Sequence, residues 1–348
     1  MENEILDVLI VGAGLSGIGA AVHLTKRCPG KSFAIVEARE RMGGTWDLFK
    51  YPGIRSDSDM YTLGFNFKPW TARKAIADAP SILTYLRETI SDYHLEDKIR
   101  FSQKVVNASW SSEEALWTVS LADGEGAVRT IKCNFLHMCS GYYNYAEAHD
   151  PDFPGKADFA GKIVHPQFWP DNLDYAGKKV VVIGSGATAV TLVPSMAKTA
   201  AHVTMLQRSP TYIVSLPGED KWALRFRKVL PSKLAYLLTR WKNVLWGLFT
   251  FNLARNKPAV FKKRLLDMVK EEMGPDVDMT DFTPSYNPWD QRLCLAPDSD
   301  MFESITSCTS SIVTDNVDRF HRVGIVLKSG KKLESYVTVA PSVLELLP

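Results

Sequence analysis

The chain carries the same short pattern twice: an apolar run, a glycine-rich turn and a helix-forming segment. The first turn, GAGLSG at residues 12–17, follows the run VLIV at 8–11, and the second, GSGATA at 184–189, follows VVVI at 180–183. In such a turn a buried strand ends and a helix begins. The backbone N–H groups and the helix dipole can then stabilise a phosphate, and the glycines let it approach closely. The pattern predicts two βαβ units, each of which binds a dinucleotide.

The residue at the end of the second strand differs in charge between the two units. Glu37 lies twenty residues past Gly17, whereas Arg208 lies nineteen residues past Ala189. A carboxylate there accepts hydrogen bonds from free ribose hydroxyls, and a guanidinium pairs with a 2′-phosphate. With Ser209 beside it, Arg208 predicts a preference for NADPH over NADH of about ten- to a hundredfold, because a charge-assisted hydrogen bond is worth roughly 1.5–3 kcal/mol.

The residues after Glu37 favour FAD as the first dinucleotide. Residues 43–46 read GGTW, so Gly43 and Gly44 permit a second close approach of the backbone to a long cofactor. Trp46 offers a flat apolar surface near it. FAD fits this arrangement better than NAD, and the alternative is a surface turn with a buried tryptophan.

Charge and cysteine usage exclude several classes of protein. A net charge of +2 gives no bulk attraction to nucleic acid. The five cysteines form no CxxC pair, which argues against a zinc site, a redox-active dithiol or a disulfide framework and indicates a reducing compartment. The first strand leaves no room for a signal peptide, and the longest apolar stretch, residues 244–253, is too short to span a bilayer. We therefore expect a cytoplasmic protein without a metal site.

The remaining pattern predicts an α/β fold with two Rossmann-like dinucleotide-binding domains, for FAD and for NADP, and a helical insertion. Between the two βαβ units, residues 105–110, 116–121 and 128–134 predict an antiparallel meander. A further buried strand is expected at 135–139, followed by a polar, proline-rich link. We expect residues 1–146 to form the FAD domain, 153–215 with 288–340 the NADP domain, and 216–287 the helical insertion.

The helical insertion is rich in tryptophan, leucine, lysine and arginine. Its simplest interpretation is a set of helices packed beside the second domain. The basic and apolar mixture around residues 241–251 also allows a face that touches the inner surface of a membrane or a partner.

Between the two glycine turns, residues 159–170 read FAGKIVHPQFWP. The pattern FxGxxxHxxxWP resembles the fingerprint of Baeyer–Villiger monooxygenases, whereas related N- and S-oxygenating flavin monooxygenases usually lack the Trp-Pro ending. The resemblance extends over nearly the whole chain, through YPGIRSDSDMY at 51–61, SGYYNY at 140–145, QRSPTY at 207–212 and YNPWDQR at 286–292. It implies an enzyme that uses FAD, NADPH and O2 to convert a ketone into an ester, and that can also oxidise sulfur in thioethers or thioamides.

The resemblance also implies roles for individual residues. Arg292 matches the family's active-site arginine, and Asp57 matches the acid that orients it beside the flavin. An arginine suits this role because it keeps its proton near neutral pH and provides a fixed positive charge. His165 has an ordinary pKa near neutral and could act as a base, but we favour a structural role in the linker between the domains.

The expected cofactor-binding residues fall into two sets. For FAD they are Gly12, Gly14, Ser16, Gly17, Glu37, Gly44, Thr45, Trp46, Asp47, Asp57 and Val105. For NADP they are Arg55, Ser56, Gly184, Ser185, Gly186, Ala187, Thr188, Ala189, Val190, Arg208 and Ser209.

One segment departs from the family. Relatives return to the flavin domain, after the second nucleotide domain, through a strand with a pattern like DIIxxATG. The corresponding residues 334–343 read ESYVTVAPSV and lack the Asp, Thr and Gly. We therefore expect the FAD domain to lack its C-terminal return.

Two other functions stay open from the sequence. A flavin disulfide reductase also has two nucleotide domains, but the missing CxxC pair argues against it. A catalytically inactive remnant of a monooxygenase would keep both glycine turns and still bind dinucleotides.

Overall fold

The computed structural model describes residues 4–148, 150–291 and 293–340, which form two compact units. Of the described residues, the first unit contains 4–49 and 79–143, and the second contains 50–78 and those between 144 and 340. Each unit has its own parallel strands and its own apolar core. No helix among the described residues is long and apolar enough to cross a lipid bilayer.

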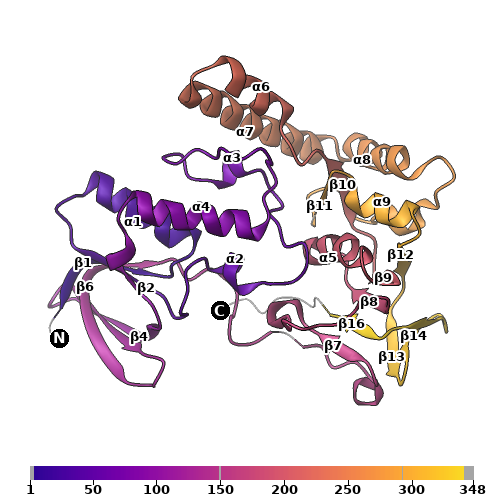
Figure 1. Ribbon diagram of the computed structural model, residues 1–348, viewed down its shortest axis with the longest axis horizontal. Coiled ribbons are helices and arrows are strands. Elements are labelled where there is room, and N and C mark those ends of the chain that lie inside the picture. The colour runs from indigo at the N-terminus through magenta and orange to yellow at the C-terminus, as the bar shows by residue number, and fades with distance from the viewer. Residues whose placement is uncertain (1–3, 149, 292, 341–348) are drawn as a thin grey trace. The chain divides into compact units, whose positions relative to one another are not determined.

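The first unit is built on a six-stranded sheet with the order β3-β2-β1-β6-β5-β4. Its strands are β1 (Ile5–Val11), β2 (Phe33–Val36), β3 (Ile99–Arg100), β4 (Lys104–Ser111), β5 (Leu116–Ala122) and β6 (Val128–Met138). Its helices are α1 (Leu15–Arg27), α2 (Thr45–Leu48), α4 (Ala79–Asp92) and the 3₁₀ turn η1 (Glu96–Lys98). The helix α1 packs on β1 and β2, and α4 lies beside α1 (Figure 1).

The strand β6 corrects one expectation. We predicted separate strands at residues 128–134 and 135–139, the second one buried, but β6 is continuous. It pairs antiparallel with β5 up to Cys133 and parallel with β1 up to Met138. Beyond Cys133 the described structure gives β6 a strand neighbour on one side only, and Phe135 and Met138 are exposed. The prediction of a buried strand there was therefore wrong.

The second unit has a parallel sheet with the order β12-β9-β8-β16-β7. Its strands are β7 (Lys162–Val164), β8 (Lys179–Ile183), β9 (His202–Gln207), β12 (Ser310–Thr314) and β16 (Val337–Val339). The helices that belong with it are α5 (Ala187–Ala197) and α9 (Asp300–Thr306), with 3₁₀ turns η2 (Lys156–Asp158) and η3 (Pro166–Phe168). A three-stranded antiparallel sheet is formed by β13 (Val317–His321), β14 (Gly324–Leu327) and β15 (Lys332–Glu334).

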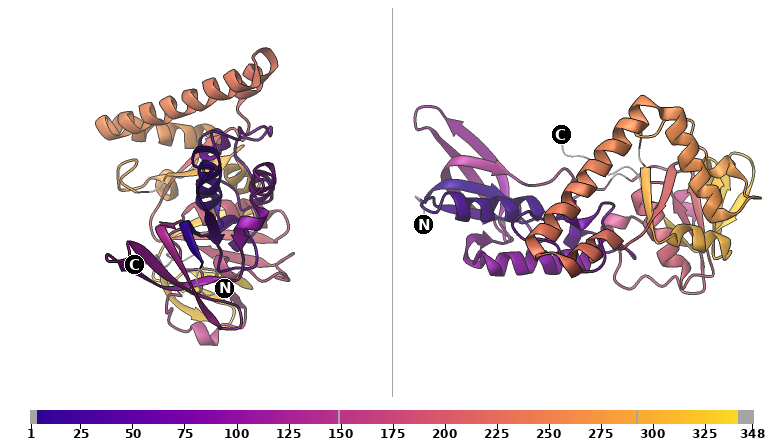
Figure 2. Two further views of the ribbon diagram at one scale, coloured as in Figure 1. Left: turned by 90° about the vertical axis from the view of Figure 1, so that its left-hand side faces the viewer. Right: turned by 90° about the horizontal axis from the view of Figure 1, so that it is seen from above.

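The helical segment of the second unit lies between β10 (Tyr212–Leu216) and β11 (Leu293–Pro297), and these two strands pair in parallel. Between them lie α6 (Lys221–Val229), α7 (Ser232–Asn256), α8 (Pro258–Met273) and η4 (Met279–Phe282). The 25-residue helix α7 packs against both α6 and α8, and Figure 2 shows it as the longest helix of this segment.

The boundary between the units differs from the predicted domain boundary. We assigned residues 50–78 to the first domain, but the structure groups them with the second. This stretch contains α3 (Met60–Leu63), which packs on α7. Arg240 of α7 donates a hydrogen bond to the carbonyl oxygen of Tyr61 over 2.7 Å, and Arg55 forms an ion pair with Asp300 of α9. These long-range contacts hold the stretch in the second unit.

The segment that departs from the family's return strand contributes β16 to the second sheet. Within it, β16 pairs in parallel with both β8 and β7, with Val337 opposite Val180 and Lys162. Its residues Val337 and Val339 are fully buried in the core of the second unit. The strand lies between β8 and β7 in this sheet. A hydrophobic sequence without the family's Asp, Thr and Gly therefore serves as an interior strand.

Candidate dinucleotide sites

The three glycines of the first turn, between β1 and α1, meet different surroundings. A Cβ on Gly12, whose φ is +107°, would overlap the carbonyl oxygen of Cys139, and a Cβ on Gly17 would overlap that of Gly12. A Cβ on Gly14 would meet only Gly44, in ordinary contact at 3.6 Å. The outer two glycines are thus required by the protein's own packing, whereas Gly14 leaves space for a ligand to approach the backbone.

The carboxylate of Glu37, at the end of β2, is buried and faces the same turn. Its Oε2 accepts a hydrogen bond from the Ala13 N–H over 2.8 Å, and its Oε1 accepts one from the Arg39 N–H over 3.0 Å. A carboxylate can accept about four hydrogen bonds, so capacity remains for ribose hydroxyls. Glu37 therefore supports the turn as well as lying where a ribose acceptor was predicted.

The second pair of glycines, which leads into α2, lies beside the first turn. The Gly43 N–H donates to the carbonyl oxygen of Ala13 over 3.0 Å. Gly43 and Gly44 both have positive φ values, +120° and +56°. A Cβ on Gly43 would overlap the Leu83 side chain, whereas Gly44 lies beside Gly14. Gly14 and Gly44 together form a backbone cradle of the kind that a dinucleotide requires.

The other residues expected at FAD lie around this cradle. Ser16 is in the first turn of α1, and Thr45, Trp46 and Asp47 are the first three residues of the short helix α2. Asp47 forms an ion pair with Arg39, with a distance of 2.6 Å between the Arg39 Nη2 and the Asp47 Oδ2.

Val105 lies at the beginning of β4, and its neighbour Gln103 donates its N–H to the Glu37 carbonyl oxygen over 2.9 Å. Except for Asp57, which lies in the second unit, the residues predicted to bind FAD lie in the first unit.

The second turn repeats the arrangement of the first. Gly184, with φ of +138°, donates its N–H to the carbonyl oxygen of Leu206 in β9 over 2.7 Å. Gly186 directly precedes the first turn of α5. The residues from Ala187 to Val190 are the first four of α5, as predicted from the pattern. Ser185 lies beside the backbone of Ser209. Arg208 follows β9 directly and is exposed.

Sequence reasoning missed how the loop at residues 51–57 is fixed on α5. Gly53 has φ of +78°, and a Cβ there would overlap the Ser195 hydroxyl. Burial raises the pKa of the Tyr51 phenol, and its hydrogen bond with Thr188 partly offsets this. Neither contact has a local signal in the sequence, because Tyr51 and Gly53 lie far along the chain from α5.

Two of the predicted NADP residues lie in this loop and are engaged in protein contacts. The Arg55 guanidinium pairs with both carboxylate oxygens of Asp300, including an Nη2–Oδ1 distance of 3.3 Å. The buried Ser56 hydroxyl accepts a hydrogen bond from the Ala77 N–H over 3.1 Å. Their contacts give both residues a structural role next to α5, and contact with NADP stays a prediction.

The FxGxxxHxxxWP segment has an architectural role in the second unit. His165 accepts the Gln167 N–H at Nδ1 over 3.2 Å and caps η3. The buried Gln167 side chain donates to the Asn144 carbonyl oxygen over 2.8 Å, which fixes the link that enters this unit. Trp169 packs against the core. These contacts support the structural role that we favoured for His165.

The predicted catalytic pair is only half described. Arg292 lies outside the described residues. Asp57 lies in the loop between Gly53 and α3, and its side chain is exposed. The pairing of Arg292 with Asp57 therefore stays a prediction, as does contact of Asp57 with a flavin.

Comparison with known families gives two matches. The family described as flavin-binding monooxygenase-like matches residues 75–247, and the NAD(P)-binding Rossmann-like domain family matches residues 10–73. The second match covers the first glycine turn, Glu37 and the Gly43–Gly44 pair.

Individual relatives match nearly the whole chain at about 50% identity. The chain is 52% identical over 346 residues to the FAD-containing monooxygenase EthA of Mycobacterium tuberculosis, which covers 99% of this chain and 71% of that protein. It is 51% identical over 346 residues to EthA of Mycolicibacterium smegmatis, covering 99% of this chain and 70% of that one.

Solved structures with lower identity show the same fold. An open crystal structure of cyclohexanone monooxygenase matches with a TM-score of 0.78 at 21% identity, covering 99% of this chain and 74% of that one. Oxidized steroid monooxygenase bound to NADP matches with a TM-score of 0.79 at 22% identity, covering 97% of this chain and 70% of that one. The predicted α/β class with two Rossmann-like domains is confirmed.

Proposed function

Because the chain belongs to the family of FAD-containing monooxygenases, we propose that it transfers one oxygen atom from O2 to a small organic substrate with electrons from NADPH. The substrate, O2, NADPH and a proton would give the oxygenated product, NADP⁺ and water. The observation that carries this proposal is the identity of 52% along 99% of the chain, which includes both glycine turns. The acidic Glu37 after β2 and the basic Arg208 after β9 support FAD at the first turn and NADPH at the second.

The first unit fits FAD on the geometry of its backbone. The open space beside Gly14 and the adjoining Gly44 provides an approach to exposed backbone, while Gly12 and Gly17 are held by protein contacts. The N–H groups at the start of α1 would face the pyrophosphate, and the Glu37 carboxylate would accept the ribose hydroxyls. FAD, when bound and reduced, supplies the activation of O2.

Arg208 supports the preference for NADPH. It is exposed beyond the end of β9, beside Ser209, where the 2′-phosphate of a dinucleotide on the second turn would lie. NADH lacks this phosphate, so replacement of Arg208 should weaken the binding of NADPH and leave the binding of NADH nearly unchanged.

The FxGxxxHxxxWP segment supports a substrate class. We propose a ketone, which oxygen insertion would convert into an ester, and, as a second class, a thioether or thioamide oxidised at sulfur. Arg292 would contribute the fixed cation that stabilises negative charge during oxygen transfer, and Asp57 would be its positioning residue.

The test is spectroscopic and kinetic. The purified chain with added FAD should show flavin absorbance, and it should oxidise NADPH in an O2-dependent reaction that yields an ester or a sulfoxide. Flavin retention without turnover would favour an inactive dinucleotide-binding protein. Absence of both flavin binding and NADPH oxidation would contradict the proposal.

A variant of Arg292 separates oxygen transfer to the substrate from the oxidation of NADPH. Arg292→Ala should still consume NADPH but yield hydrogen peroxide in place of oxygenated substrate, whereas Arg292→Lys should retain part of the product. Equal product yield from the wild type and Arg292→Ala would remove Arg292 from the mechanism.

A further inference from the structure

The segment from Lys221 to Arg264 has a charge unlike that of the rest of the chain. It contains twelve lysine and arginine residues and no aspartate or glutamate, whereas the whole chain has a net charge of only +2. The remaining residues are therefore net acidic. Nine of the twelve basic side chains are exposed, and they lie on α6, α7 and α8 and in the links between these helices.

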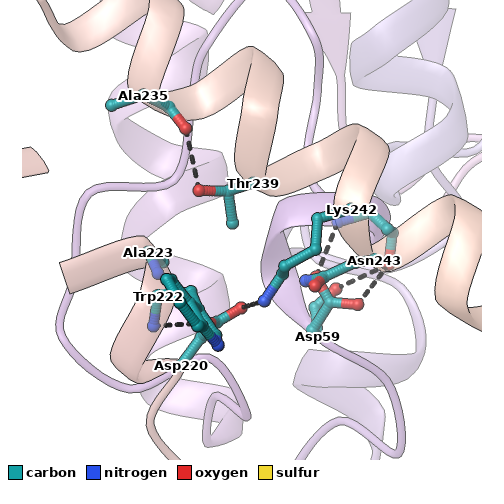
Figure 3. Close-up of polar contacts among 9 residues, drawn as sticks. Asp59, Asp220, Trp222, Ala223, Ala235, Thr239, Lys242 and Asn243 are labelled. Atoms are coloured by element: carbon teal, nitrogen blue, oxygen red, sulfur yellow. Dashed lines mark hydrogen bonds and ion pairs between the residues drawn. The ribbon is translucent and has the colours of Figure 1, made fainter. Parts of the chain in front are cut away.

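The inward face of α7 is held by polar contacts. The Lys242 ammonium pairs with Asp220 over 2.6 Å, and the Asn243 amide donates to Asp59 over 2.9 Å. Thr239 is buried and bonds back to the Ala235 carbonyl oxygen. Figure 3 shows Lys242 and Asn243 directed toward the two carboxylates. These anchors fix the rotation of the helix about its axis.

The outward face of α7 is apolar. Its large side chains recur at intervals of four, three, four and three residues, which places them on one side of a helix. They form what we call the α7 stripe: Leu234, Leu238, Trp241, Leu245 and Leu248, each between 42% and 59% exposed. Phe249 is also exposed beside the stripe, and Trp246 is exposed on the side of the helix that carries Thr239 and Asn243. The outer side of a helix in an aqueous protein is normally polar, so this face requires an apolar neighbour.

We propose that the face formed by the α7 stripe and the surrounding basic residues docks on the surface of an anionic phospholipid bilayer. Charge complementarity favours lipid over a second copy of the chain, because two copies would bring two uniformly basic segments together. Tryptophan and leucine beside lysine and arginine are the composition of helices that lie in the interface between headgroups and acyl chains. Since no described helix can cross a bilayer, α7 would lie on it.

The proposal is independent of the redox function, because it involves none of the residues assigned to FAD, NADPH or oxygen transfer. The α7 stripe would enter the boundary of the acyl chains, and the lysines and arginines would pair with phosphate headgroups. Binding should therefore require anionic lipid and weaken as salt rises, because salt screens the contribution of each basic residue.

Flotation of the full chain with lipid vesicles tests this proposal. Vesicles of phosphatidylcholine with about 30% phosphatidylglycerol should carry the protein upward, whereas pure phosphatidylcholine vesicles should not. The double variant Trp241→Gln and Leu245→Gln should lower the bound fraction about tenfold. A matched double variant, Phe168→Gln and Val323→Gln, replaces two exposed apolar residues elsewhere and should bind as the wild type does.

Charge is tested by a separate variant. Lys221→Ser with Arg225→Ser and Lys228→Ser should weaken binding to the anionic vesicles, and circular dichroism should show unchanged helix content in every variant. Failure of the wild type to float, or equal flotation of the wild type and the stripe variant, would overturn the proposal. If light scattering instead showed a dimer that the stripe variant dissociates, without flotation, the face would be an interface between copies.

Discussion

Both carboxylate oxygens of Glu37 accept backbone hydrogen bonds, so this side chain links the first turn to the end of β2. Glu37→Gln would replace one acceptor by an amide donor facing another donor. We expect a loss of about 1–3 kcal/mol in the free energy of unfolding without FAD, because a buried donor is left unsatisfied. Urea unfolding of the apoprotein measures this, with exposed Glu40→Gln as the control. Unchanged stability would mean that the carboxylate serves only the ligand.

Arg208 is the residue on which the choice of nicotinamide cofactor depends. Arg208→Gln should raise the KM for NADPH about ten- to a hundredfold and leave the KM for NADH within a small factor, because only NADPH has a 2′-phosphate for the guanidinium. Steady-state oxidation of both cofactors at low ionic strength measures the change. The control is Lys198→Gln, which replaces an exposed lysine at the C-terminal end of α5 and should change neither KM. A parallel loss for both cofactors would assign Arg208 a structural role.

At the scale of elements, Gly53 fixes the loop that carries Arg55 and Ser56 against α5. Gly53→Ala would combine a positive φ with an overlap on the Ser195 hydroxyl. Gly126 has a similar φ of +86° but open space around it, so Gly126→Ala isolates the backbone cost of about 1–2 kcal/mol. We expect Gly53→Ala to lower the unfolding free energy by clearly more than this, and to weaken NADP⁺ binding. Equal costs in thermal or urea unfolding would show that the loop can shift away from α5.

The contact between α6 and α7 has a predictable dependence on pH. Burial alone would raise the pKa of Asp220, but hydrogen bonds from Lys242 and from the N–H groups of Ala223 and Trp222 outweigh it, and the pKa lies below its ordinary 3.8. A depressed pKa in the folded state adds stability above pH 3.8, and this stability is lost as the pH falls through the folded value.

Asp220→Asn should therefore be less stable than the wild type at neutral pH, and the difference should narrow as the solution is acidified below pH 3.8. Urea unfolding across the pH series measures both curves. The exposed pair of Asp318 and Arg319 offers a control, since Asp318→Asn should give nearly the same curve as the wild type. A constant gap at all pH values would contradict the ionic contribution of Asp220.

At the scale of the whole molecule, the glycine turns were predictable because their signals are local. An apolar run, glycines at fixed spacing and a charged residue about twenty positions later all lie within one βαβ unit. The pairing of Arg55 with Asp300 was not predictable, because the two residues are 245 positions apart. The sequence around each of them is typical of an exposed segment. The same reason explains why sequence patterns did not group residues 50–78 with the second unit, because their contacts with α5, α7 and α9 are all long-range.

The expected partition of β6 failed for a related reason. One long strand that pairs first with one neighbour and then with another has the same pattern of apolar residues as two short strands in succession. Only the register, with Cys133 opposite Trp117 of β5 and Leu6 of β1, shows that the chain continues. Local patterns thus predicted the elements, and long-range pairing determined their extent and their grouping.

Two separate cores lead to a prediction for the molecule as a whole. Leu9 lies in the core of the first unit and Leu192 in that of the second, and both are fully buried. Leu9→Ala and Leu192→Ala should each cost about 2–5 kcal/mol locally. Hydrogen exchange followed by mass spectrometry should show faster exchange in residues 5–48 and 79–138 for Leu9→Ala, and in the strands and helices of residues 162–339 for Leu192→Ala. Each unit opens by loss of its own packing. Faster exchange throughout the chain from either substitution would show that the units unfold as one cooperative body.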